Sequence, residues 1–178
     1  MAKPNFSHHP LLVSVVSILV GGFGLYWVQL KADRNKALME KRLSLINEVV
    51  DYRENAAAVL RFINLFTCQI EKAHLSRQDR VRREEEFSNR MSQIYRQENL
   101  LGTKLQIYFP NEETLRRFEK LQLAFHDGVN TGTIHLQKAT PSGKCLENER
   151  AGEMQNKFNQ LGKDSKFLLE KMAASTRL

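Results

Sequence analysis

Between Gly24 and Gly102 the chain contains neither glycine nor proline, an uninterrupted stretch of 77 residues. This stretch is rich in Leu, Glu, Lys, Arg, Gln and Ala, all of which favour the α-helix. Glycine and proline are the strongest local breakers of regular structure, so their absence over this length predicts helix almost throughout. No segment of the chain alternates convincingly between apolar and polar residues with the period of two that a strand requires. The sequence therefore predicts an all-α fold.

The apolar residues of this stretch recur at alternating spacings of four and three, which is the heptad pattern of packed helices. Ile46, Val50, Leu60 and Phe62 widen the apolar stripe in its first part. A stripe this wide suits a multi-helix bundle better than a two-stranded coiled coil. The residues that keep the heptad spacing are Leu38, Leu45, Val49, Tyr52, Ala56, Val59, Ile63, Phe66, Ile70 and Ala73, and later Phe87, Met91, Ile94, Leu101, Leu105 and Tyr108.

Two further helices are predicted after Pro110, which ends the long stretch. Asn111 is an N-cap candidate, and acidic residues fill the turn that follows it. Residues 139–144, Ala-Thr-Pro-Ser-Gly-Lys, predict a loop, and a last helix is expected from about Leu146 to Met172. The predicted buried faces of these two helices are Leu115, Phe118, Leu121 and Phe125, and Met154, Phe158, Leu161, Leu168 and Met172.

Two arrangements of these helices fit the pattern. In the first, the chain turns near residues 74–79 and folds back, which gives an antiparallel four-helix bundle. Ser76 and Asp79 have the spacing of a capping box at such a turn. In the second, one helix continues as a rod to Tyr108, about 115 Å beyond Lys31, and the last two helices fold back along its distal end. The unbroken heptad frame favours the rod, but the wide stripe favours the bundle, which we predict.

The twenty residues 11–30 carry no charge and are long enough to cross the hydrocarbon core of a bilayer as a helix. Tyr26 and Trp27 lie at its end, where aromatic side chains favour the headgroup region, and Lys31 and Arg34 follow as interfacial anchors. A cleavable signal peptide is disfavoured because the run is long and no small-residue cleavage site follows it. We therefore predict a short tail at 1–10, a transmembrane helix at 11–30 and a helical domain at 31–178.

Ser14, Ser17, Gly21 and Gly24 form one stripe of small residues along this predicted transmembrane helix. Small residues let two membrane helices approach closely and gain dispersion contacts. The stripe therefore predicts a packing face, whose partner is a second copy of the chain or a helix of another membrane protein. The lipid bilayer itself is the other expected partner.

The orientation of the helical domain rests on opposed signals. Five basic residues within 31–42 follow the apolar run, against Lys3 before it, and the positive-inside rule alone would place the domain in the cytoplasm. Long domains are translocated largely regardless of their charge, and a short tail with one lysine is typical of an uncleaved signal anchor. We predict a single-pass protein of a bacterial inner membrane, with its C-terminal domain outside the cytoplasm.

Cys68 and Cys145 are the only two cysteines of the chain. In the heptad frame Cys68 falls on the outer side of its helix, and the loop before Cys145 returns to the level of residues 68–80 in either arrangement. A disulfide is therefore geometrically possible, and it would indicate an oxidising compartment such as a periplasm. Two unrelated free thiols fit the sequence about as well; the disulfide is the outcome that we predict.

No catalytic, metal-binding or cofactor site is predicted. The five histidines form no His-x-x-x-His pattern, and no Cys-x-x-Cys pair, phosphate-binding loop or nucleophile motif occurs. Arg77, Arg80, Arg82 and Arg83 precede three glutamates, which predicts a solvated charged face and no nucleic-acid partner. All 20 acidic residues and all but one of the 27 basic residues follow residue 30, so the helical domain carries a net charge of +6.

These features predict an accessory or assembly subunit, and not an enzyme, that packs against other membrane proteins or forms a homo-oligomer. An anchored extracytoplasmic four-helix bundle is also similar, in architecture and in no motif, to the sensor domains of bacterial chemoreceptors and kinases. That similarity implies a sensory or ligand-binding module as an alternative. A helical tether, similar to phage spanins, is a third reading if the rod arrangement holds.

Overall fold

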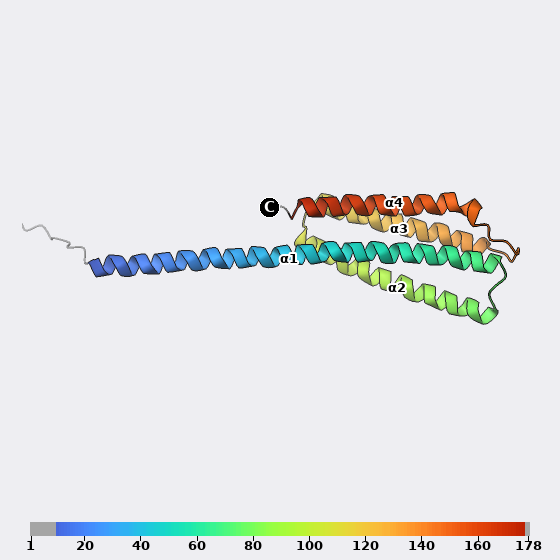
Figure 1. Ribbon diagram of the computed structural model, residues 1–178, viewed down its shortest axis with the longest axis horizontal. Helices are drawn as coiled ribbons and strands as arrows, with labels where there is room; N and C mark the ends of the chain where they lie inside the picture. The colour runs from blue at the N-terminus through green and yellow to red at the C-terminus, as the bar shows by residue number, and fades with distance from the viewer. Residues whose placement is uncertain (1–9, 177–178) are drawn as a thin grey trace, which may run out of the picture. The chain divides into compact units, whose positions relative to one another are not determined.

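The computed structural model describes the backbone of residues 10–176, and their side chains from residue 22 onward except for 147–149. This part of the chain forms α-helices and no strand (Figure 1), which confirms the predicted all-α class and the helical bundle. The helices are α1 (Pro10–Glu71), α2 (Arg77–Tyr108), α3 (Glu112–Lys138) and α4 (Glu147–Ala174). The chain separates into two compact units, Met1–Glu40 and Lys41–Leu178, and the bundle belongs to the second.

A turn at residues 72–76 divides the long glycine-free stretch, so the fold-back arrangement is confirmed and the continuous rod is wrong. Ala73 adopts a left-handed backbone with φ 56°, and the His74 N–H donates to the Gln69 carbonyl at 3.2 Å, which closes the end of α1. Ser76 caps α2, because its Oγ accepts the Asp79 N–H at 3.1 Å. The turn contains no glycine and no proline, so composition alone could not locate it.

The other helix ends lie close to their predicted positions. Asn111 caps α3, because its Oδ1 accepts the Thr114 N–H at 2.9 Å. Glu112 and Glu113 fill the first turn, where the helix dipole favours negative charge. The loop between α3 and α4 begins at Ala139, at the predicted position.

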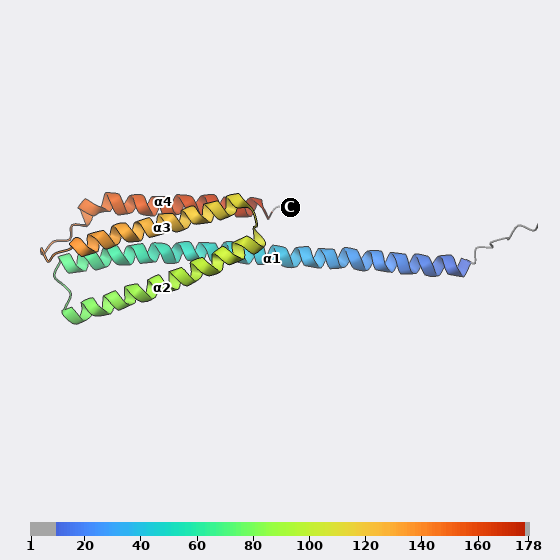
Figure 2. The same cartoon turned by 180° about the vertical axis from the view of Figure 1, so that it is seen from behind.

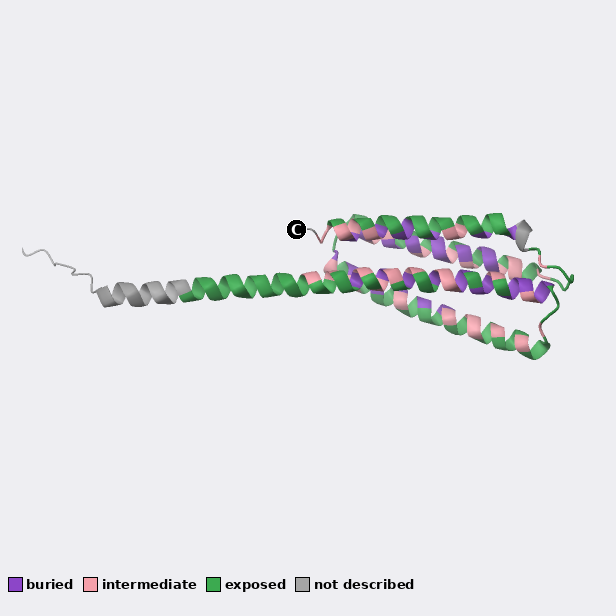
Figure 3. Ribbon diagram, viewed as in Figure 1, coloured by how far each residue is buried: buried purple, intermediate pink, exposed green. Residues whose placement is uncertain are grey.

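The buried face of α1 follows the heptad pattern from Leu45 to Ile70 and faces the other helices of the bundle (Figure 3). The bundle is antiparallel, as the views from the two sides agree (Figures 1 and 2). Side-chain contacts fix the direction of α2 against α1, with Lys104 Nζ 2.6 Å from a Glu48 oxygen. The largest fully buried side chains are Tyr52, Phe66, Phe125, Leu45, Leu60, Ile63, Ile94, Leu105, Leu121, Leu161, Leu168 and Met172.

Two glycines of α3 allow α1 to approach closely. A Cβ atom at Gly128 would stand 3.0 Å from both methyl groups of Leu60, and one at Gly132 would stand 2.7 Å from Cγ2 of Ile63. The second distance is too short for a real contact, so these two glycines fit a close helix crossing although glycine lowers helix propensity. α3 accordingly continues through both positions to Lys138.

Adding one methyl group at Gly132 is therefore expected to destabilise the protein. We expect Gly132→Ala to lower the free energy of unfolding by about 1–3 kcal/mol through overpacking against Ile63. Gly162 in α4 is the matched control, because nothing lies within 4 Å of a Cβ there. Gly162→Ala should stabilise by about 0.5–1 kcal/mol through helix propensity. Urea unfolding checks both values, and stabilisation by both substitutions would contradict the close crossing of α1 and α3.

Candidate functional site

An acidic residue occupies a core position of α2. Glu98 lies four residues after Ile94 and three before Leu101, so it continues the heptad spacing of buried side chains, and only 6% of its surface is exposed. In the sequence, this site is marked only by one carboxylate at a heptad position. A search for apolar residues at that spacing does not detect it. Burying a carboxylate is unfavourable unless hydrogen bonds replace those to water, so its partners determine what the site can do.

Side chains from the two neighbouring helices hold Glu98. The Tyr52 hydroxyl of α1 donates to Oε1 of Glu98 at 2.6 Å, and Nε2 of His126 on α3 lies 3.1 Å from the carboxylate. Tyr95 stacks on the His126 ring, with ring centroids 5.5 Å apart and an interplanar angle of 15°. Tyr52, Glu98 and His126, named here the polar cluster, therefore connect three helices of the bundle.

The environment of Tyr52 keeps its hydroxyl protonated. The side chain is fully buried, with the Phe118 and Phe125 ring centroids 6.0 and 6.4 Å from its own. Burial raises the pKa of Tyr52 far above its ordinary value, and the hydrogen bond to the Glu98 carboxylate raises it further. Tyr52 is therefore a neutral hydrogen-bond donor to Glu98.

The raised pKa of Tyr52 predicts a loss of stability at alkaline pH. Above a pH of about 10 the tyrosine is deprotonated in the unfolded chain, whereas folded Tyr52 keeps its proton. The unfolded state then binds fewer protons, so this residue should lower the free energy of unfolding by about 1.4 kcal/mol per pH unit. Urea unfolding across this range checks the slope. Tyr52→Phe should reduce the slope of the free energy of unfolding against pH by the contribution of one proton. An unchanged slope in this variant would contradict the raised pKa of Tyr52.

A hollow of about 310 Å³ lies between α2 and α3 beside Glu98. Leu115 and Phe118 form its apolar wall, and Gly102 faces that wall, since a Cβ there would stand 3.8 Å from the Phe118 ring. Among the described residues that line the hollow, none is a lysine, arginine or histidine. The remaining lining residues are Asn99, Thr103, Gln106, Glu119 and Gln122. This hollow and the polar cluster together form the candidate site.

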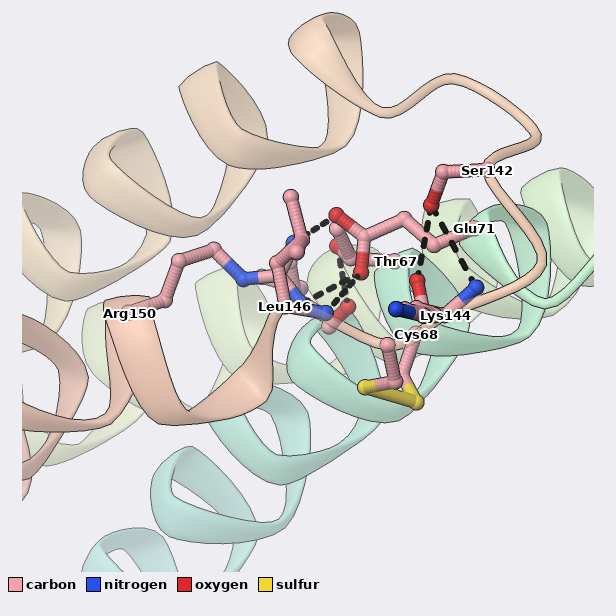
Figure 4. Close-up of a disulfide and its surroundings, with 9 residues drawn as sticks. Thr67, Cys68, Glu71, Ser142, Lys144, Leu146 and Arg150 are labelled. Atoms are coloured by element: carbon pink, nitrogen blue, oxygen red, sulfur yellow. Dashed lines mark hydrogen bonds and ion pairs between the residues drawn. A yellow bond between two sulfur atoms is a disulfide. The ribbon is translucent and has the colours of Figure 1, made fainter.

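Cys68 and Cys145 form a disulfide, with their Cα atoms 4.9 Å apart (Figure 4). The bridge joins the C-terminal end of α1 to the segment that directly precedes α4. Cys68 is nine-tenths buried, which corrects the expectation that it faces outward. The loop after α3 explains the difference, because the N–H groups of Ser142 and Gly143 both donate to the Glu71 carbonyl at 2.9 Å and draw this loop onto α1.

A buried ion pair lies next to the bridge, and the sequence pattern did not indicate it. Two guanidinium nitrogens of Arg150 lie 2.5 and 3.0 Å from the two carboxylate oxygens of Glu71. The same carboxylate accepts the Leu146 N–H at 2.9 Å. The N-cap residue Leu146 makes no side-chain cap hydrogen bond, and Glu71 supplies an acceptor and the negative charge that a helix N-terminus favours.

The predicted membrane segment falls partly outside the described residues. The tail residues 1–9 and the side chains of Ser14, Ser17 and Gly21 belong to that undescribed part. Gly24 has nothing within 4 Å of an added Cβ, and Tyr26, Trp27, Lys31 and Arg34 are all exposed. In the part of the chain that the structure describes, no helix is long and apolar enough to cross a membrane. The span at 11–30 and its boundaries stay predictions.

Within the described residues, no three His, Cys, Asp or Glu side chains are grouped so that they could hold a metal ion. No protein-family model, curated protein or solved structure matches the chain. The function must therefore be inferred from the residues themselves.

Proposed function

We propose that the chain is a single-pass, membrane-anchored accessory or assembly subunit that acts by packing against a membrane protein or a second copy of itself. Residues 11–30 span the bilayer in this proposal. The observation that carries it is the apolar surface at the start of α1, where every large side chain from Phe23 to Val28 is at least 65% exposed. A helix that is apolar on all sides requires lipid or protein around it.

The bundle also offers a surface suited to a protein partner. A groove of about 580 Å³ runs between α3 and α4, and Leu123 and Phe167 expose apolar surface along it. Arg117 lies over the Phe167 ring at 5.1 Å, and Lys120, Lys163, Asp127 and Asp164 also line the groove. Protein interfaces commonly combine apolar contact surface with polar and charged side chains. This groove supports packing as the mode of action.

The Cys68–Cys145 disulfide supports a location of the bundle outside the cytoplasm, because disulfides persist in oxidising compartments. Labelling of thiols in intact bacterial cells tests this. We expect a membrane-impermeant maleimide to label the two cysteines only after a reductant has been added outside. Thiols that react without reductant, and only in vesicles that expose the cytoplasmic face, would contradict this location.

Association through the anchor is tested by extraction in mild detergent followed by native mass spectrometry. We expect a homo-oligomer or a complex of defined composition. Gly21→Leu should weaken it, since a large side chain would separate helices that pack through the small-residue stripe. Leu19→Phe adds bulk on the opposite side of a helix with this register and is the control. A purely monomeric wild-type chain, or equal effects of both substitutions, would contradict the proposal.

The polar cluster and its hollow favour a second candidate function, a ligand-binding module. Glu98 occupies a heptad position that apolar residues take elsewhere on α2, and it borders a hollow of the size that small ligands use. The tether function loses the rod arrangement that motivated it, because α1 ends at Glu71 and the chain folds back.

A further inference from the structure

We propose that the hollow between α2 and α3 binds a small organic ammonium ion that carries an apolar group. This proposal deepens the second candidate function, on which it rests, by naming the class of ligand. The volume of about 310 Å³ lies at the lower end of the range for small-molecule sites. A compact amine, and not a large cofactor, matches this space.

The charges of the hollow select a cation. Of the lining residues that the structure describes, Glu98 and Glu119 are the ionisable ones, and both are acidic. The chain as a whole carries a net charge of +7, so an acidic hollow is a local property and does not follow from composition. Glu119 is exposed and makes no ion pair among the described residues, which leaves its carboxylate available to a ligand.

Glu98 can accept further hydrogen bonds. A carboxylate offers about four lone-pair sites, and Tyr52 and His126 occupy one each. An ammonium group has three donors and can use the remaining sites. Because the carboxylate is nine-tenths buried, a cation beside it would interact in a medium of lower dielectric than water, where the attraction is stronger.

The apolar wall accounts for the second half of the ligand. Leu115 and Phe118 line the hollow from α3, and Gly102 lines it from α2, opposite the Phe118 ring. An aromatic face attracts a cation as well as an apolar group. The hollow thus combines two acidic side chains with an apolar wall, which matches an amine that bears a hydrocarbon substituent.

Binding of such a cation would act on three helices at once. Glu98 on α2 is hydrogen-bonded to Tyr52 on α1, and His126 on α3 contacts the same carboxylate. A cation held beside Glu98 binds only the folded bundle, in which these contacts are assembled, so it stabilises that bundle by mass action. The predicted readout is therefore a saturable rise in melting temperature.

The test uses the full chain in mild detergent with three probes of similar shape, namely phenethylamine, 2-phenylethanol and 3-phenylpropionate. We expect only the amine to raise the melting temperature and to give a saturable heat of binding. Equal shifts with the amine and the alcohol would overturn the ammonium assignment. Binding of 3-phenylpropionate alone would also overturn the ammonium assignment, but it would still support a ligand-binding function. A lack of response to all three would count against both.

Two pairs of variants locate the site. Glu119→Gln should weaken amine binding about fivefold, whereas Glu85→Gln, which removes an exposed acid of α2 outside the hollow, should not. Gly102→Met should fill the hollow and weaken binding by about tenfold or more. Gly162→Met adds the same side chain in open space on α4 and is its control. Unchanged affinity in both Glu119→Gln and Gly102→Met would overturn the proposed location.

Discussion

Replacing both Cys68 and Cys145 by serine is expected to lower the free energy of unfolding by about 4 kcal/mol. The two residues are 77 positions apart, and their bridge closes a loop that contains α2 and α3. In the chain-entropy model, releasing a loop of this length gives the unfolded state much more freedom. For a domain of this size the loss corresponds to a fall in melting temperature of roughly 15 °C.

Thermal and urea unfolding of the full chain in mild detergent measure this loss. The wild type in the presence of a reductant should melt close to the double variant, and the double variant should not respond to reductant. A wild type whose melting temperature is the same with and without reductant would show that the bridge is absent or contributes nothing.

The second large effect is expected at the buried ion pair. Arg150→Met should lower the free energy of unfolding by about 3–5 kcal/mol, because it leaves the Glu71 carboxylate buried without its cation. Only 3% of Glu71 and 7% of Arg150 are exposed, so water cannot replace the lost partner. Urea unfolding at neutral pH measures the loss.

The double variant Glu71→Gln, Arg150→Met tests the cause. It should recover part of the loss, since no uncompensated charge remains inside the bundle. Arg116→Met, which breaks the exposed pair with Glu112 on α3, should change stability by less than about 1 kcal/mol and is the control. A double variant as unstable as Arg150→Met would indicate that packing, and not the unpaired charge, accounts for the effect.

Local sequence signals predicted the helices and their caps. Ser76 with Asp79, and Asn111 with Thr114, are three residues apart, so each cap depends only on its own neighbourhood. The heptad frame misled in one respect, because it continues in phase through the turn at residues 72–76 and so suggested a rod. After Ala73 the next three positions of the frame are the polar residues Arg77, Arg80 and Glu84, and this interruption of the apolar pattern coincides with the turn and the start of α2.

The candidate site and the buried ion pair could not be predicted in the same way, because their contacts connect distant parts of the chain. Tyr52 and Glu98 are 46 residues apart, and Glu71 and Arg150 are 79 apart. A carboxylate on a helix is usually solvated, and only the packing of a second helix over it shows that it is buried. The pairing of Cys68 with Cys145 could not be decided from the sequence for the same reason. The sequence indicates that both cysteines lie at the same height along the bundle, but it does not show that the loop before α4 brings them into contact.

The disulfide also decides how the domain would carry a mechanical load. The shortest covalent route between the two ends of the chain follows α1 to Cys68, crosses the bridge to Cys145 and continues along α4. Residues 69–144, which include α2 and α3, are not on this route. Tension applied between the termini is therefore carried covalently by α1 and α4, and it reaches the helices with Glu98 and His126 only through non-covalent contacts such as the Tyr52–Glu98 hydrogen bond.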